Sequence, residues 1–529
     1  MTTISPFAAG SYVANRNTAQ LLTLKNQLND LSNQLSSGKV SQTYGGLGTG
    51  RSTALAAQGT LSALDGYATG ITAAQTRTNL AVTSLTQVAT LGTSARAALN
   101  NGLQSVAVNS TAGRSLALAN LQTALDTLNQ SAAGNYLFGG RDTTTQPVLD
   151  ADTILNGSTD AEGKPLDGLS EVIKERVEAQ LGTDGNGRLA KSSSATSVKF
   201  TEEASATIPR LFGFTLTGTP TKTGAALNAT ITGTNPASLN VSLAAQPTAG
   251  DSISFSVKTP DGTSATVTLT AANSADSSST TSFAIGASIA DTMTNLSKTL
   301  DNALKGAASS TLAVDATADA ATQFFSGSVN GGLTGKGVIP QRVQYVGTTP
   351  VGYAPPDPNT TVLWYQGENT YDTTKTPAVP TPALDTQSVQ VSATGKVGTG
   401  ARANDPTIQN VLAGLATMAF ALPTTSDANT GATYQTVNDR AGALLSSSDQ
   451  SDPSIQDTVT QLSIASTRLS NASTTNAATK NSLQNTLDGI EQAPTEEVVA
   501  KLLDVQNRLQ ASYQITSSLS KLSLVNYIS

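Results

Sequence analysis

Leucines spaced three and four residues apart near the N-terminus are the strongest constraint on how this chain can fold. Their spacing of 3, 4, 3 and 4 places them on one face of a helix, in the order Leu21, Leu24, Leu28, Leu31 and Leu35. Gly38 then ends the run. The pattern predicts a helix that pairs with another helix along its length.

A second and a third segment repeat the pattern after a glycine-rich break at residues 44–50. A helix is predicted from about Ser52 to Leu99, and its apolar face includes Leu61, Leu64, Ile71 and Leu85. At 1.5 Å per residue this helix would be roughly 70 Å long, which exceeds the width of a compact domain and predicts a rod. The third segment carries Leu118, Leu121, Leu125 and Leu128 and is predicted to end at Gly134.

The last 120 residues mirror the first. Leu483, Leu487 and Ile490 precede Pro494, which is predicted to lie in the first turn of the final helix. Glu496 and Glu497 follow, where negative charge suits a helix N-terminus. The apolar positions of that helix are Val498, Leu502, Val505, Leu509, Ile515, Leu519 and Leu522. Periodicity alone fits the cores of two ordinary bundles equally well, but its position at both chain ends favours one paired rod.

The middle of the chain has a different pattern. Residues 254–257 and 265–270 alternate polar and apolar side chains around Pro260-Asp261-Gly262, which predicts a hairpin. An amphipathic helix follows at residues 289–304, so a strand, strand, helix module is expected near 250–305. Further strands are predicted at 214–216, 239–243 and 362–365.

These patterns predict a mostly α fold with an α+β insertion. Residues 1–140 and 401–529 are expected to form helical rod segments, and residues 141–400 a β-rich projecting domain. An insertion of this kind is readily accommodated at the tip of a helical hairpin, because its two ends lie close together.

Composition argues against most enzyme classes. The 529 residues include no Cys and no His, which removes thiol nucleophiles, imidazole bases and the usual zinc ligands. The formal charge of −7, without clusters of Lys or Arg, argues against a nucleic-acid partner. The sequence begins without a recognisable secretory signal and has no apolar window of 18 residues, so no membrane insertion is expected.

Short motifs do not alter this interpretation. Residues 45–52, Gly-Gly-Leu-Gly-Thr-Gly-Arg-Ser, resemble a phosphate-binding loop with Arg51 in place of lysine, but no strand is predicted before them. Residues 184–187 begin like a calcium loop but lack its final glutamate, so a turn is predicted. The pairs Glu202-Glu203 and Glu496-Glu497 are interpreted as solvated helix starts. The sequence therefore predicts no catalytic, cofactor-binding or metal-binding residue, and no enzyme.

Both ends of the chain resemble the bacterial flagellin family. Residues 27–39 match its N-terminal pattern, in which a leucine-spaced helix leads into Leu35-Ser36-Ser37-Gly38 and a basic residue, and residues 509–528 are similar to its terminal helix. The resemblance covers about 140 residues at the N-terminus and about 120 at the C-terminus, in the expected order.

Two roles within that family remain open. The stretch 135–140, Asn-Tyr-Leu-Phe-Gly-Gly, is more similar to the hook-filament junction protein, and segments 362–367 and 400–405 resemble the same subgroup. The length of the chain and its large middle region favour a filament flagellin, which is the role we expect. The family's arginine-rich innate-immune stretch is replaced here by residues 90–96, so receptor recognition through it is not expected.

The resemblance implies an extracellular structural protein of the flagellum, exported unfolded by the flagellar type III apparatus without a cleaved signal. Its partners would be other copies of itself, hook-associated and cap proteins and an export chaperone. Terminal helices that are completed only on assembly would supply the interface, which we expect to include Leu21, Leu24, Leu28, Leu31, Leu35, Leu61, Leu64, Ile71, Leu85, Leu502, Val505, Leu509, Leu519, Leu522 and Tyr527. A surface adhesin with a glycan-binding middle domain fits the Ser/Thr-rich strands but not the termini.

Overall fold

The computed structural model describes residues 6–104, 110–205, 207, 210–330, 337–376 and 379–528. The chain is mostly helical, with long helices near both ends and β-sheets between residues 131 and 398, which confirms the predicted fold class. It divides into two compact units. The terminal unit contains Met1–Thr72, Gln390–Gly395 and Leu469–Ser529, and the central unit contains Ala73–Val389 and Lys396–Arg468. Both units combine segments that are distant in sequence.

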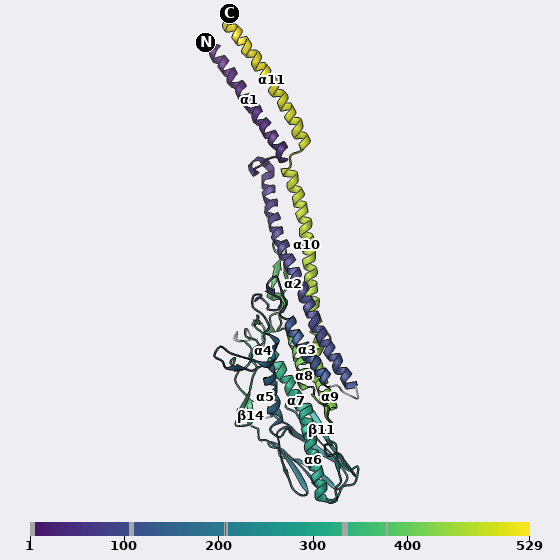
Figure 1. Cartoon of the computed structure of the whole chain (residues 1–529). Coiled ribbons are helices and arrows are strands. Elements are labelled where there is room, and N and C mark those ends of the chain that lie inside the picture. Colours follow the sequence, from purple (N-terminus) through teal and green to yellow (C-terminus); the bar gives the residue numbers. More distant parts are fainter. Residues whose placement is uncertain are drawn as a thin grey trace. The chain divides into compact units, whose positions relative to one another are not determined.

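The helical elements are labelled in Figure 1 where space allows. In chain order they are α1 (Pro6–Ser37), η1 (Tyr44–Gly50), α2 (Arg51–Gln104), α3 (Ser110–Thr127), α4 (Ala151–Asn156), α5 (Leu169–Leu181), α6 (Ile289–Ala307), η2 (Ala308–Leu312), α7 (Ala313–Phe325), η3 (Ala383–Thr386), α8 (Pro406–Ala421), α9 (Thr430–Leu445), η4 (Ser446–Ser448), α10 (Ile455–Glu491) and α11 (Thr495–Ile528). The η2 segment is a π-helical turn, and the other η segments are 3₁₀ helices.

The strands lie between α3 and α8. They are β1 (Ser131–Ala132), β2 (Asn135–Tyr136), β3 (Ser158–Thr159), β4 (Pro165–Leu166), β5 (Leu189–Ser193), β6 (Ser197–Glu202), β7 (Thr215–Thr223), β8 (Leu227–Thr232), β9 (Ser238–Leu243), β10 (Ser252–Lys258), β11 (Ser264–Ala272), β12 (Ser282–Ala284), β13 (Val343–Val346), β14 (Thr349–Tyr353), β15 (Tyr371–Asp372), β16 (Val379–Pro380), β17 (Ser388–Gln390) and β18 (Lys396–Gly398).

The ends of the long helices follow the signals in the sequence closely. α1 ends one residue before Gly38, whose φ of +68° lies in the left-handed region that favours glycine at a helix C-terminus. α2 begins at Arg51, one residue before the predicted start, and ends at Gln104, five residues beyond the predicted end at Leu99. Two details differ. Pro494 lies immediately before α11 rather than in its first turn, and its carbonyl accepts a hydrogen bond from the Val498 amide at 2.9 Å. α3 ends at Thr127, before a short β1–β2 hairpin that contains Gly134.

The central unit is built around α8, which contacts α3, α7 and α9. α8 is apolar on nearly all sides, and side chains from Thr407 to Ala419 are buried around its circumference. A helix of this kind needs neighbours on every face, and the chain supplies them from segments as distant as α3 and α9. The predicted apolar face of α3 is partly correct, because Leu121, Leu125 and Leu128 are buried whereas Leu118 is exposed.

A β-module, defined here as residues 189–307, forms the second part of the central unit. Its two mainly antiparallel sheets have the strand orders β12-β11-β10-β7 and β5-β6-β9-β8. The predicted hairpin is present as β10 and β11, with Phe255 opposite Val267. The predicted helix is α6, whose Ser288 hydroxyl accepts a hydrogen bond from the Asp291 amide. α6 and both sheets share one apolar core, so the expected strand, strand, helix module is confirmed.

Two predictions about the middle region are wrong. Residues 362–365 are not a strand, because their backbone groups bond to several separate segments, including Leu149 and Asp167. Glu202 is not at a helix start; it ends strand β6 and is only 3% exposed. Its carboxylate accepts hydrogen bonds from the Leu216 and Ala237 amides at 2.5 and 3.1 Å. The remaining predicted strands are β7, which begins at Thr215, and β9.

Candidate assembly surface

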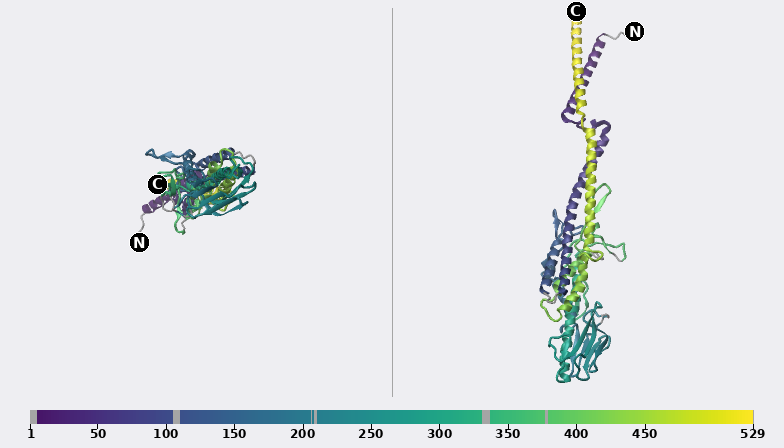
Figure 2. Two further views of the ribbon diagram at one scale, coloured as in Figure 1. Left: turned by 90° about the horizontal axis from the view of Figure 1, so that it is seen from below. Right: turned by 90° about the vertical axis from the view of Figure 1, so that its right-hand side faces the viewer.

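Helices α1 and α11 of the terminal unit contact each other and run antiparallel, so that both chain ends lie at the same end of the pair (Figures 1 and 2). The shielded positions of α11 are spaced 4, 3, 4 and 3, as a pairing seam requires: Val498, Leu502, Val505, Leu509 and Ser512. Those of α1 are Asn17, Leu21, Leu24, Leu28, Leu31 and Gln34. The leucine spacing therefore identified the faces of the two helices that pair.

The ends of the two seams differ from the prediction. Leu35 is exposed and Gln34 is half-buried in its place. Ile515 is 59% exposed, and the last shielded position of α11 among the described side chains is Ser512. The side chains of Leu519, Leu522 and Tyr527 lie outside the described residues.

The pairing seam leaves other large apolar side chains of α11 in solvent. Val499, Leu503 and Tyr513 are exposed, with Leu503 at 53%. At 100° per residue these three lie on one face, which we call the outer stripe, roughly 100° around the helix from the seam. On α1, Tyr12 and Leu22 are likewise exposed. Exposed glutamines, Gln506 and Gln510, lie on the same face of α11 between Leu503 and Tyr513, so the outer stripe combines apolar and amide side chains.

The two chain segments that connect the helices of the terminal unit are bonded to each other. The Val40 amide donates to the Glu491 carbonyl at 2.7 Å, and the Ala493 amide donates to the Gly38 carbonyl at 2.9 Å. The Lys39 ammonium lies 3.3 Å from the Glu491 carboxylate. These contacts fix the joint at which α1 leads into η1 and α10 leads into α11.

The terminal unit also holds part of α2 against part of α10. Ala54, Leu61 and Leu487 form a small core, and Lys480 pairs with Asp65 at 2.6 Å. Leu64 and Ile71 are buried in the same unit, and Leu85 is buried in the core of the central unit. The side chains of these four predicted interface residues, Leu61 included, therefore stabilise a single copy of the chain.

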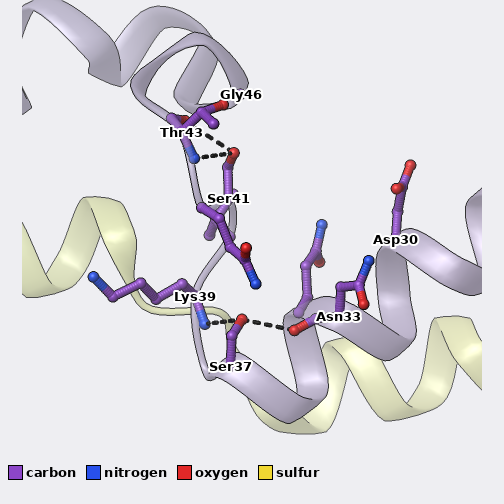
Figure 3. Close-up of a pocket in the computed structure, with 10 residues that line it drawn as sticks. Asp30, Asn33, Ser37, Lys39, Ser41, Thr43 and Gly46 are labelled. Atoms are coloured by element: carbon purple, nitrogen blue, oxygen red, sulfur yellow. Dashed lines mark hydrogen bonds between the residues drawn. The ribbon is translucent and has the colours of Figure 1, made fainter.

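A polar groove of about 370 Å³ lies between the end of α1 and the segment that follows it (Figure 3). Asn33, Gln34 and Gln42 supply amides, and Ser37, Ser41 and Thr43 supply hydroxyls. The Ser41 hydroxyl accepts from the Thr43 amide at 3.1 Å, which shapes the loop. Asp30 and Lys39 are the charged residues among its lining. This groove can hydrogen-bond a polar partner but contains no nucleophile paired with a base.

The motifs that could have carried chemistry lie in other structural contexts. Residues 44–50 form η1, and the described residues between α1 and η1 contain a single β-bridge at Lys39 rather than the strand of a phosphate-binding loop. Residues 184–187 form a turn, and the Asn186 side-chain amide donates from Nδ2 to the Leu189 carbonyl at 2.7 Å. Among the described residues, no group of three or more acidic side chains is placed to hold a metal ion. None of the described helices is long and apolar enough to span a lipid bilayer.

Residues 135–140, 362–367 and 400–405 meet in the central unit, where the Tyr365 hydroxyl donates to the Phe138 carbonyl at 3.4 Å. The Ala403 amide donates to the Phe138 carbonyl at 2.9 Å, and the Gly140 amide donates to the Ala401 carbonyl at 3.2 Å. The Tyr365 hydroxyl donates to the Glu368 carbonyl at 3.0 Å, and burial raises the pKa of that phenol. Trp364 donates from its indole N–H to the Phe325 carbonyl at 2.9 Å. These contacts form one buried centre.

The outer stripe was not predicted, because only one apolar face was assigned to each helix. The four-residue spacing of Val499 and Leu503 was the available signal. No known protein-family model matches the chain, and no curated protein matches it significantly.

Proposed function

We propose that this chain is a structural subunit of the bacterial flagellum, which self-assembles through its terminal helices into the helical filament. The supporting observation is the α1–α11 pair, which satisfies one seam on each helix and leaves the outer stripe of α11 in solvent. The resemblance of both chain ends to flagellin is the reason for proposing that this assembly is the flagellar filament. Contacts between unlike surfaces that repeat without closing build a filament.

The experiment is to place charge on the outer stripe. The double variant Leu503→Glu, Tyr513→Glu is expected to fold but not to polymerise, because burying two carboxylates at an interface is unfavourable. Far-ultraviolet circular dichroism checks the helices, and sedimentation and electron microscopy measure the filaments. A matched control, Ala500→Glu with Ala511→Glu, adds the same charge to exposed positions on another face of α11 and is expected to assemble. Normal filaments from the first variant would refute the proposed interface.

Deletion of Val498–Ser529 tests the larger claim. It removes all but the first three residues of α11 and is expected to abolish assembly while the central unit stays folded, because the apolar clusters of that unit contain no residue of α11. Filaments of normal length from this truncation would contradict assembly through the terminal helices.

A second role, hook-filament junction protein, is favoured by one specific observation. The segments at 135–140, 362–367 and 400–405, which resemble that subgroup, are joined by hydrogen bonds in one buried centre. A junction needs about one ring of subunits, whereas a filament needs thousands, so abundance relative to hook protein in sheared flagella separates the roles. Immunogold labelling restricted to the hook-proximal end would replace the filament proposal with the junction.

Two functions of other classes predict different results. A nucleotide-binding module would bind ATP or GTP with magnesium saturably, and the Arg51→Ala variant would lose this binding. If the chain is a structural subunit, no such binding is expected. An adhesin would depend on its middle domain, so assembly by a chain lacking residues 150–390 favours the structural role.

A further inference from the structure

The β-module has its own apolar core, and two chain segments link it to the rest of the central unit: residues 182–188, which follow α5, and the helical run from α6 through η2 to α7. Leu211 and Gly213 of the module also form hydrogen bonds with the Gln180 side chain of α5. Buried residues of both sheets and α6 form one cluster, and α7, α8 and α9 contribute to another. Between α6 and α7 the run passes through the π-turn η2. A π-turn breaks the regular hydrogen-bond ladder of a helix and is a recurrent site of bending.

A single guanidinium connects a hairpin turn of the β-module to these helices. Arg440 of α9 donates from Nε to Asp315 of α7 at 2.7 Å. Its other nitrogen donates to Asp261, in the turn between β10 and β11, and to the Thr263 hydroxyl at 2.5 Å. The hairpin turn of the module and two helices thus meet on one side chain.

The site contains more carboxylates than the guanidinium can satisfy. Asp315 is buried, and its Oδ2 atom has no hydrogen-bond partner. Asp319 of α7 interacts with the same group, and the positive charge that lowers its pKa most is that of Arg176 of α5. Burial raises the pKa of Asp315 to about 6, despite the hydrogen bond from Arg440, and the charges of Asp261 and Asp319 add to the effect. Burial also raises the pKa of Asp319.

We propose that Arg440 is an acid-tightened latch, which holds the β10–β11 turn of the β-module against α7 and α9 and releases this turn when the latch opens. One proton on Asp315 removes its repulsion with Asp261 and gives the unpartnered oxygen a hydrogen to donate. Withdrawal of the hairpin turn would expose Asp315 to water and remove Asp261 from its vicinity, so the open form holds that proton less tightly.

The direction of the pH response follows from this difference. The latched form binds a proton on Asp315 below about pH 6, whereas a solvated aspartate binds one only below about pH 4. Acid therefore favours the latched form, and the ratio of latched to open molecules falls as the pH rises through this window. The largest change that one such proton can produce is about a hundredfold.

The experiment measures the distance between the β-module and α9 in the full chain. Because the chain has no cysteine, Ser264→Cys and Ala432→Cys at exposed positions accept spin labels only where intended. Pulsed electron paramagnetic resonance is expected to give one narrow distance at pH 5 and a growing second population at pH 8. Asp315→Asn is expected to stay latched at both values.

Variants of the latch complete the test. Arg440→Gln is expected to populate the second distance at pH 5 as well, and Asp261→Asn, in a surface turn, is expected to do so without removing a charge from the helices. Lys199→Gln removes a charge from an exposed position of the same module and is expected to behave like the parent. An Arg440→Gln or Asp261→Asn chain with the parent's distances, or an Asp315→Asn chain with the parent's pH response, would overturn the proposal.

Discussion

Helices α8 and α1 show how differently the two units use a helix. α8 has 16 residues, and a continuous run from Val411 to Ala419 is buried. α1 has 32 residues, and none of its described side chains is buried. A helix that is apolar all round must find every neighbour within its own chain, whereas a helix with one leucine seam is satisfied on one side only. The chain therefore supplies every neighbour that α8 needs, and the terminal pair retains surface for further contacts.

The largest expected contrast comes from equal substitutions on the two helices. Leu415→Ala on α8 is expected to reduce the free energy of unfolding by about 2–5 kcal/mol, because it leaves a cavity in a dense core. Leu28→Ala, at a half-buried position of the α1 seam, is expected to cost less than about 1.5 kcal/mol in the unassembled protein. Urea unfolding measures both. Equal losses would remove the distinction between the units.

The substitution of Asp315 is expected to have the next largest effect on stability, and the direction of its pH dependence can be predicted. Its pKa is raised to about 6 in the folded protein, so the native state binds more protons than the unfolded state between about pH 4 and 6. Stability from this group therefore falls as the pH rises through that window. Asp315→Asn is expected to raise the free energy of unfolding at pH 8 by up to about 3 kcal/mol and to flatten the pH dependence.

The measurement is urea unfolding at several pH values for the parent and Asp315→Asn. A useful control is Asp276→Asn, whose carboxylate is exposed. The interpretation fails if Asp315→Asn is less stable than the parent at pH 8 and equally stable at pH 4.

Two glycines of α2, one in each unit, allow the packing of the two units to be compared within one helix. A Cβ at Gly92, in the central unit, would collide with the Ser448 side chain and lie 3.1 Å from Val411 Cγ1. A Cβ at Gly59, in the terminal unit, would meet nothing within 4 Å. Gly92→Ala is expected to destabilise by about 1–3 kcal/mol through overpacking. Gly59→Ala is expected to stabilise by about 0.5–1 kcal/mol through helix propensity. Thermal unfolding of the two variants measures both changes in stability. If both variants gained or both lost stability, the expected difference between the two units would be wrong.

The smallest effect is expected at the ion pair of the terminal unit. Lys480 and Asp65 lie 2.6 Å apart, but both side chains are about half exposed or more. Water and salt screen such pairs, so Lys480→Gln is expected to change stability by less than about 0.5 kcal/mol, and less at high salt. A loss above 1 kcal/mol would show that the terminal unit depends on this charge pair more than on its seams.

The sequence by itself determined the features that depend on spacing within one segment. The leucine seams, the end of α1 at Gly38 and the β10–β11 hairpin around Asp261 all follow from residues close together in the chain. Local backbone geometry sets these features, because the periods of helix and strand differ and glycine relieves a strained turn.

Only the tertiary structure decided what each side chain meets. Glu202 was predicted to be solvated, but strand β6 places it against the Leu216 and Ala237 amides, which are 14 and 35 residues away in sequence. Residues 362–365 have strand-like composition, but their hydrogen bonds go to several segments and build no ladder. Asp261, Asp315 and Arg440 lie together in the structure, although Asp261 and Arg440 are 179 residues apart in sequence. Burial and charge pairing are properties of such distant neighbours, and no period in the local sequence encodes them.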